Sequence, residues 1–137
     1  MANGMTSTTF VKIIDEPYIV KETVRKQIEQ TLILPEMGGI LGTNEKNLVT
    51  AYHHDTTGRT TTRTYTPDIT SLNKVIIEWS QSEIDFIGFV HSHPPNKTEL
   101  SIIDIRYAEK IKVCCEMTEI LMLLYIPADK SFYQYVL

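Results

Sequence analysis

The chain has 137 residues, of which 42% are hydrophobic and 22% are charged, and its formal net charge at pH 7 is -4. This size and composition are typical of one folded domain and exclude a disordered polypeptide. The acidic balance and the scattered Lys and Arg residues argue against a nucleic-acid partner and against a polybasic contact with a membrane. No signal peptide or membrane-spanning run is recognisable and the two cysteines are adjacent, so we expect a cytoplasmic protein without a disulfide framework.

The first half of the chain predicts a strand, a helix and a hairpin. Residues 1–7 are small and polar and predict a flexible N-terminus, followed by a single domain over residues 8–137. Val24, Ile28 and Leu32 recur every four residues after a helix-start signal at Pro17, which predicts an amphipathic helix. The expected elements are a strand over 10–14, this helix over 17–33, a strand over 39–43, a polar turn over 44–47 and a return strand over 48–52.

The second half predicts two further helices that alternate with buried strands. Residues 53–66 are polar and have no helical period, so they are interpreted as a loop, with an irregular strand as the alternative. Apolar residues at helical spacing follow Pro67 and Asp68 and predict a helix ending near Gln81. The remaining expected elements are a strand over 84–91, a helix over 101–115, a strand over 120–126, a turn over 128–130 and a strand over 132–136. This order predicts the α/β class, with a mixed β-sheet and flanking helices.

One cluster of residues carries recognisable chemistry, at the end of the strand expected over 84–91. Residues i and i+2 of a strand point to the same face, so His91 and His93 can converge on one point. Asp104 follows in the first turn of the next helix, on the face that also carries Ser101 and that we expect to be buried. A buried carboxylate is costly unless it is paired or binds a metal. Two His and one carboxylate suit a zinc ion and leave one position open, as in catalytic sites.

Simpler interpretations exist for each part of this cluster. A His-x-His pair alone is weak support for a metal, and Ser101 followed by Asp104 is also a typical helix cap. The cap and the ligand interpretations are compatible, and the combination is far rarer by chance than either part. Metal-assisted hydrolysis also needs a proton acceptor, for which Glu36 is the candidate. Taken alone, Glu36 would more simply be a solvated loop acid.

The arrangement of these residues resembles the JAMM motif of the MPN/JAB metalloproteases. The motif is His91-x-His93, seven residues, then Ser101-x-x-Asp104, with Glu36 upstream of a Gly-Gly strand. The segment from Arg63 to Asp68 and the following helix also resemble bacterial JAB-domain proteins, so the resemblance covers about residues 10–137. It implies a cytidine-deaminase-like fold, one zinc ion held by the two His and Asp104, Glu36 as general acid/base and Ser101 as support for the oxyanion.

The resemblance also implies the function. It implies a zinc-dependent peptidase or isopeptidase that hydrolyses the bond after the C-terminal Gly of a ubiquitin-like protein or a similar C-terminus. A ubiquitin-like protein or conjugate would be the substrate, and an activating enzyme encoded nearby a further partner, as in some anti-phage operons. The alternatives are a non-catalytic MPN interaction scaffold and a metallohydrolase that acts on a sulfur-carrier protein or a small amide.

Other polar and aromatic residues have no assigned role in the proposed chemistry. His53 and His54 are expected in an exposed loop, and Cys114 and Cys115 are expected as small buried residues of the third helix. Trp79 is expected to pack the second helix on the sheet. Tyrosines of the last two strands are expected in the core or at the sheet edge; they are Tyr125, Tyr133 and Tyr135.

Overall fold

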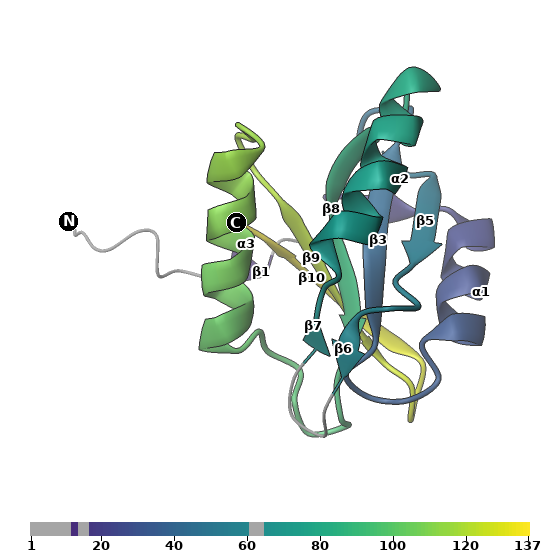
Figure 1. Ribbon diagram of the computed structural model, residues 1–137. Coiled ribbons are helices and arrows are strands. Elements are labelled where there is room, and N and C mark those ends of the chain that lie inside the picture. The colour runs from purple at the N-terminus through teal and green to yellow at the C-terminus, as the bar shows by residue number, and fades with distance from the viewer. Residues whose placement is uncertain (1–11, 14–16, 61–64) are drawn as a thin grey trace.

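A computed structural model describes residues 12–13, 17–60 and 65–137 of the chain. Its main sheet has six strands in the order β1-β10-β9-β8-β3-β5, and β8 and β9 run parallel while the other neighbours are antiparallel. The fold therefore belongs to the mixed α/β class that the sequence predicts (Figure 1). The strands are β1 (Lys12–Ile13), β2 (Ile19–Val20), β3 (Gly38–Thr43), β4 (Leu48–Val49), β5 (Ala51–His54), β6 (Arg59–Thr60), β7 (Tyr65–Thr66), β8 (Asp85–Ser92), β9 (Leu121–Ile126) and β10 (Ser131–Val136). The helices are α1 (Glu22–Thr31), α2 (Ile69–Gln81) and α3 (Ile102–Cys114).

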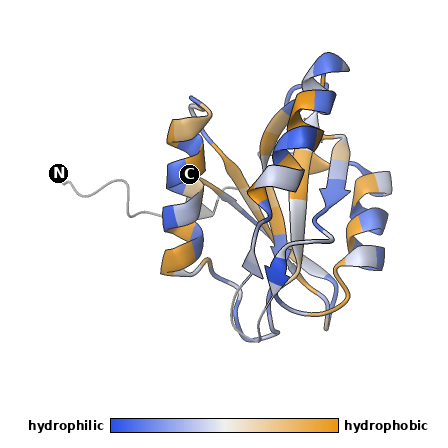
Figure 2. Ribbon diagram, viewed as in Figure 1, coloured by the Kyte–Doolittle hydropathy of each residue, from blue (hydrophilic) through white to orange (hydrophobic). Residues whose placement is uncertain are grey.

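Three helices cover the two faces of the sheet. Alternate residues of each strand point to opposite faces, so β3 contributes Leu41 to one hydrophobic cluster and Ile40 to the other. The first cluster includes Val24 and Ile28 of α1, and the second includes Leu72 of α2 together with residues of α3. Figure 2 shows hydrophobic residues along the central strands and hydrophilic residues on outward parts of the helices. Burial of the sheet on both faces explains the continuous apolar runs of β8 and β9.

The segment before α1 differs from the prediction. The helix expected over 17–33 spans only Glu22–Thr31, and Ile19–Val20 form β2, which pairs in parallel with β4. The Ile19 and Lys21 amides donate to the carbonyl oxygens of Asn47 and Val49, at 2.8 and 3.1 Å. These bonds hold the backbone extended, so the helix cannot begin until Glu22. The strand expected over 10–14 is described only at Lys12–Ile13, and residues 1–7 lie outside the described part.

The hairpin after β3 is also divided differently from the prediction. The return strand expected over 48–52 is two strands, because Leu48–Val49 pair with β2 whereas Ala51–His54 pair with β3. The predicted start of the loop at residue 53 was therefore wrong, because His53 and His54 belong to β5 and are half-buried. Short strands β6 and β7 pair within the rest of that loop. Residues 61–64 lie outside the described part.

The second half of the chain follows the prediction closely. The segments α2, β8, α3, β9 and β10 begin and end within two residues of the expected bounds. Trp79 packs against the second cluster, and Tyr125 and Tyr135 are buried as expected. The two cysteines contradict the prediction, because Cys114 and Cys115 are exposed at the end of α3. The two cysteines face away from the second cluster, against which Ile111 of the same helical turn packs.

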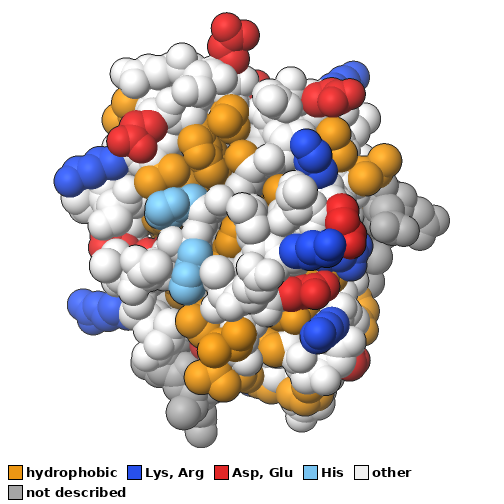
Figure 3. Space-filling view, turned by 90° about the vertical axis from the view of Figure 1, so that its right-hand side faces the viewer, with side chains coloured by type: hydrophobic (Ala, Val, Ile, Leu, Met, Phe, Trp, Pro, Cys, Tyr) orange, Lys and Arg blue, Asp and Glu red, His pale blue; other side chains and the backbone are white. Residues whose placement is uncertain are grey.

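The surface carries charges of both signs. Figure 3 shows the side of the molecule on which α1 and β5 lie, with acidic, basic and hydrophobic side chains interspersed and two histidine side chains reaching the surface. None of the helices in the described residues is both long enough and apolar enough to cross a membrane.

Candidate metal centre

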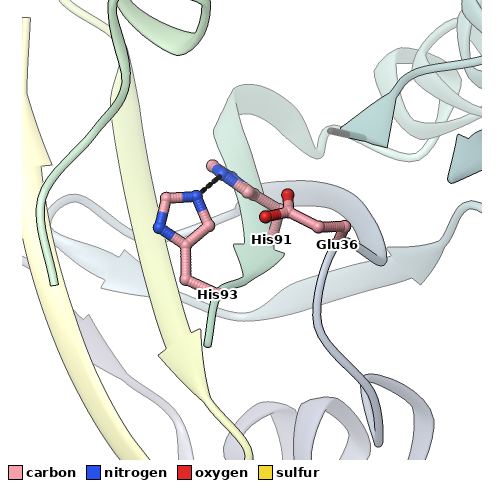
Figure 4. A group of neighbouring side chains, drawn as sticks. All are labelled: Glu36, His91 and His93. Atoms are coloured by element: carbon pink, nitrogen blue, oxygen red, sulfur yellow. Dashed lines mark hydrogen bonds between the residues drawn. The ribbon is translucent and has the colours of Figure 1, made fainter. Parts of the chain in front are cut away.

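His91 and His93 lie at the end of β8 with their side chains on the same face. Both are buried, with 3% and 4% of their surface exposed, and their Nε2 atoms are 2.7 Å apart (Figure 4). Pairing of His91 with Gly38 on one side and with Leu124 on the other fixes the strand at this point. The i, i+2 spacing therefore brings the two imidazoles together, as the sequence predicts.

Asp104 closes a triangle with the two imidazoles. Its Oδ2 atom is 3.3 Å from His91 Nε2 and 3.5 Å from His93 Nε2. A triangle with these three sides has a circumradius of about 1.9 Å, so one point lies about 2.0–2.1 Å from all three atoms, the distance at which zinc binds such ligands. The three atoms thus fit one zinc ion.

Helix capping positions the Asp104 carboxylate. Ser101 is the N-cap of α3, its hydroxyl accepts from the Asp104 amide at 3.0 Å, and Asp104 Oδ2 accepts from the Ser101 amide at 2.9 Å. This reciprocal capping box holds the carboxylate against the first turn while it faces the imidazoles. Hydrogen bonds with His91 and His93 outweigh the effect of burial and keep the pKa of Asp104 well below its usual range. The carboxylate is therefore ionised, as a metal ligand must be.

The far side of the His93 ring is held by the backbone. His93 Nδ1 lies 3.0 Å from the carbonyl oxygen of Lys97. Because a carbonyl only accepts, Nδ1 donates and the lone pair of a neutral ring is left on Nε2, facing Asp104. Such a second bond is typical of histidines that bind metals. Burial favours the neutral ring, but hydrogen bonds with Asp104 and Lys97 raise the pKa of His93 above its usual value.

Glu36 lies beside the two imidazoles in the loop before β3. It is 3% exposed, and one of its carboxylate oxygens lies within 4.8 Å of a ring nitrogen of each histidine. The interpretation of Glu36 as a solvated loop acid was wrong for the folded chain. Burial raises the pKa of Glu36, although the neighbouring His93 and His91 oppose the shift.

The backbone of Glu36 is strained. Its φ angle is 62°, in the left-handed region that non-glycine residues rarely adopt. The amide of Glu36 donates to the Ser92 carbonyl at 2.7 Å, and the Met37 carbonyl accepts from the Ser92 amide at 2.9 Å. The left-handed residue thus lets the chain turn into β3 while its carboxylate points to the histidines.

Ser92 is a residue of the site for which no structural role was predicted from the sequence. Ser92 lies between the two histidines in the sequence, and its side chain is fully buried. Its hydroxyl donates to the Leu34 carbonyl at 2.5 Å and accepts from the Met37 amide at 3.0 Å. Together with its backbone bonds, the hydroxyl attaches the loop of Glu36 to the strand that carries the histidines. Its position in the middle of His-x-His was the only available signal, because a residue there must point away from the metal face.

Tyr65 and Asp55 support His91 from the other side. The ring of Tyr65 stacks on that of His91 at 6.2 Å between centroids, and its hydroxyl donates to Asp55 Oδ2 at 2.7 Å. Asp55 is 6% exposed and also accepts from the Asp68 amide at 2.9 Å. Burial and the bond to Asp55 raise the pKa of Tyr65 well above its ordinary value. This pair was not predicted, because Asp55 precedes β6 and Tyr65 begins β7, and the sequence of this segment has no clear period.

Ser101 departs from the expected burial but lies at the site. Ser101 is exposed and Asp104 is half-buried, whereas the sequence predicted that the helix face with both residues would be buried. The Ser101 hydroxyl accepts from the Asp104 amide, and that bond leaves its own proton for another acceptor. Ser101 and Glu36 line one open cavity of about 400 Å³, together with His93 and Asp104. The cavity therefore brings together all the predicted site residues except His91, whose Nε2 atom lies 2.7 Å from that of His93.

The five residues predicted for the site come from β8, the start of α3 and two loops, one before β3 and one after β8, and the fit to zinc rests on the donor atoms of His91, His93 and Asp104. Neither a scan against protein-family models nor a search of curated proteins found a match to this chain.

Proposed function

We propose that the chain is a zinc-dependent peptidase or isopeptidase of the JAMM type. The observation that supports this most is the triangle of donor atoms from His91, His93 and Asp104, with the buried Glu36 carboxylate beside it. By the resemblance, its substrate is a ubiquitin-like protein or conjugate, cleaved after the C-terminal Gly, and an activating enzyme is a further partner. The proposed compartment is the cytoplasm, which the two free cysteines support.

Each residue has a separate task in this proposal. His91, His93 and Asp104 would hold the zinc ion, which when bound would acidify water and polarise the scissile carbonyl. The Glu36 carboxylate accepts a proton from the attacking water and returns it to the nitrogen of the leaving amine. The Ser101 hydroxyl donates a hydrogen bond to the oxygen that becomes negative during attack. The Lys97 carbonyl keeps His93 in the orientation that the metal needs.

Zinc content and cleavage rate, measured on the same preparations, test the proposal. Wild type should hold close to one zinc ion per chain by elemental analysis, and His91→Ala or Asp104→Ala should lose it. Glu36→Gln keeps the side-chain shape but cannot accept a proton, so it should retain zinc and lose activity by about 10²–10⁴-fold. Ser101→Ala should retain zinc and lose about 10²–10³-fold.

A series of fusion substrates that differ in the residue before the cleaved bond separates the proposed enzyme from the alternatives. Fusions with Gly at the end of a ubiquitin-like tail should be cleaved faster than fusions with a bulky β-branched residue there, since Gly allows the backbone to approach the metal closely. A wild-type chain that holds zinc and cleaves no member of the series would favour the interaction scaffold. A wild-type chain that takes up no zinc would contradict the whole proposal.

A further inference from the structure

A second cavity, about 150 Å³ in volume, opens beside the metal centre on the face covered by α2 and α3. Its floor is formed by Phe89 of β8 and Met122 of β9, which pair across the two strands. Phe89 lies two residues before His91, on the same face of β8, so the cavity continues directly from the histidine. The walls come from β7, from the connection between β7 and α2, and from α3; they are Tyr65, Pro67, Ile103 and Tyr107.

The cavity is nearly all apolar. The Tyr107 hydroxyl is buried and has no hydrogen-bond partner among the described residues. A buried water needs two to four polar partners, and this wall offers few beyond that hydroxyl and the metal ligands. A cavity of this size has room for a benzene-sized group. The chemistry therefore favours an uncharged apolar ligand about as large as a leucine side chain.

The metal centre and the small cavity share a wall. His91 and Asp104 line the small cavity, and Asp104 also lines the larger cavity that contains Glu36 and Ser101. Ile103 lines both cavities and is 63% exposed, so it forms the rim between them. A backbone in the larger cavity could therefore place one side chain over this rim into the smaller one.

We propose that the small cavity is a subsite for an apolar side chain next to the bond that is cleaved. The inference rests on the proposed function, because it takes the metal centre as the place of cleavage. It names the chemical class of a flanking residue, such as leucine or methionine, and Ile103 and Met122 as residues that determine specificity. Because the proposed function places Gly before the scissile bond, this apolar residue would follow the bond, and peptides with leucine or glycine after the bond would test the preference.

Methyl NMR on zinc-free protein tests the cavity without requiring activity. Protein labelled at the methionine methyl groups is titrated with 4-methylpentanamide, whose apolar part resembles leucine, and in parallel with acetamide. The Met122 methyl signal should shift and saturate at millimolar 4-methylpentanamide and stay unchanged with acetamide. The Met37 methyl is the internal control, because Met37 packs against the other cluster. Equal responses to both amides, or none at Met122, would overturn the assignment.

Two tryptophan variants provide a matched comparison. Ile103→Trp should fill the rim and abolish the Met122 shift. Ile102→Trp should leave it intact, since Ile102 is 68% exposed and lines neither cavity. Both positions lie in the exposed first turn of α3, so the two substitutions should affect folding equally. A ligand that binds Ile103→Trp as it binds wild type must occupy another place, which contradicts the proposal.

Hydroxamates on zinc-loaded protein separate this inference from the proposed function. By calorimetry, 4-methylpentanohydroxamic acid should bind about 10- to 100-fold more tightly than acetohydroxamic acid, because it also buries a leucine-like group. Equal affinities would overturn the subsite and leave the metal centre standing. If neither hydroxamate binds, the proposed metal centre fails, while the amide titration still decides whether the cavity takes an apolar group.

Discussion

Glu36 combines two unfavourable features at one position, a left-handed backbone and a buried carboxylate. A left-handed conformation costs a non-glycine residue about 1–2 kcal/mol. Burial disfavours the charged carboxylate, as the raised pKa of Glu36 indicates. A residue that is strained and desolvated in the folded chain points to a role other than stability.

Replacement of Glu36 should therefore separate stability from activity. We expect Glu36→Gly to be more stable than Glu36→Ala by about 1 kcal/mol, because only glycine adopts this φ without strain. Both variants should be inactive, since neither has a group that accepts a proton. Urea unfolding measures the difference in stability, and equal unfolding free energies would show that the backbone at residue 36 is relaxed.

Ser92→Ala should loosen the loop of Glu36. The substitution leaves the Leu34 carbonyl and the Met37 amide without their buried partner, which costs about 1–3 kcal/mol. We expect zinc content to stay near wild type and the cleavage rate to fall, because Glu36 shifts while the ligands stay. Ser80→Ala is the control, since the Ser80 hydroxyl makes its bond to Ile77 at an exposed position of α2. Unchanged activity of Ser92→Ala would mean that the backbone bonds alone hold the loop.

The site residues differ in how far the sequence could reveal them. Convergence of His91 and His93 follows from strand geometry alone, and the turn after the strand brings Asp104 near. Glu36 was a weak candidate until the family resemblance supported it, because its approach to the histidines depends on the pairing of β3 with β8 and on the Ser92 hydroxyl. Tertiary contacts of this kind leave no periodic pattern in the sequence.

At the scale of elements, the parallel pair of β8 and β9 depends on close approach at Gly88. A Cβ atom at Gly88 would overlap the backbone carbonyl of Leu121, which cannot move without breaking the pairing. We expect Gly88→Ala to lower the free energy of unfolding by about 3 kcal/mol or more. Gly42→Ala should be milder, because its Cβ would meet only side-chain atoms of Ile84 and Trp79. Denaturant unfolding of both variants tests this order.

The elements that the sequence failed to predict share one property. Strands β2 and β4 have two residues each and pair with one another away from the main sheet. Their conformation is set by a partner distant in the chain, so local propensity carries little information about them. Long segments with strong periodicity, such as α2 and β9, were predicted correctly because their own residues determine which face is buried.

At the scale of the whole molecule, one buried and two half-buried tyrosines should limit stability at alkaline pH. Burial raises the pKa of Tyr18, Tyr52 and Tyr107 to about 12, and Tyr18 also donates to Glu119 at 2.6 Å. An unfolded chain releases these protons near pH 10. The contribution of the protonated tyrosines is therefore complete below pH 10 and is lost as the pH rises toward 12.

This loss can be measured by urea unfolding between pH 9 and pH 12. The free energy of unfolding should fall steeply above pH 10. The phenolate absorbance of the folded protein should rise at a higher pH than that of the unfolded protein. Tyr18→Phe should reduce the slope, since one of the shifted groups is removed. A slope that is the same for Tyr18→Phe and wild type would show that Tyr18 titrates normally.

The residues of the proposed metal centre are brought together by chain segments of very different length. The three proposed ligands lie within residues 91–104, whereas Glu36 is separated from them by α2 and several strands. The entropy lost on closing a loop grows with its length, so during folding the ligands can meet before Glu36 joins them. A partly folded chain could thus hold zinc while lacking its proton acceptor. Under the proposed function, a newly made chain would be unable to hydrolyse bonds until β3 had paired with β8 and Ser92 had bound the loop.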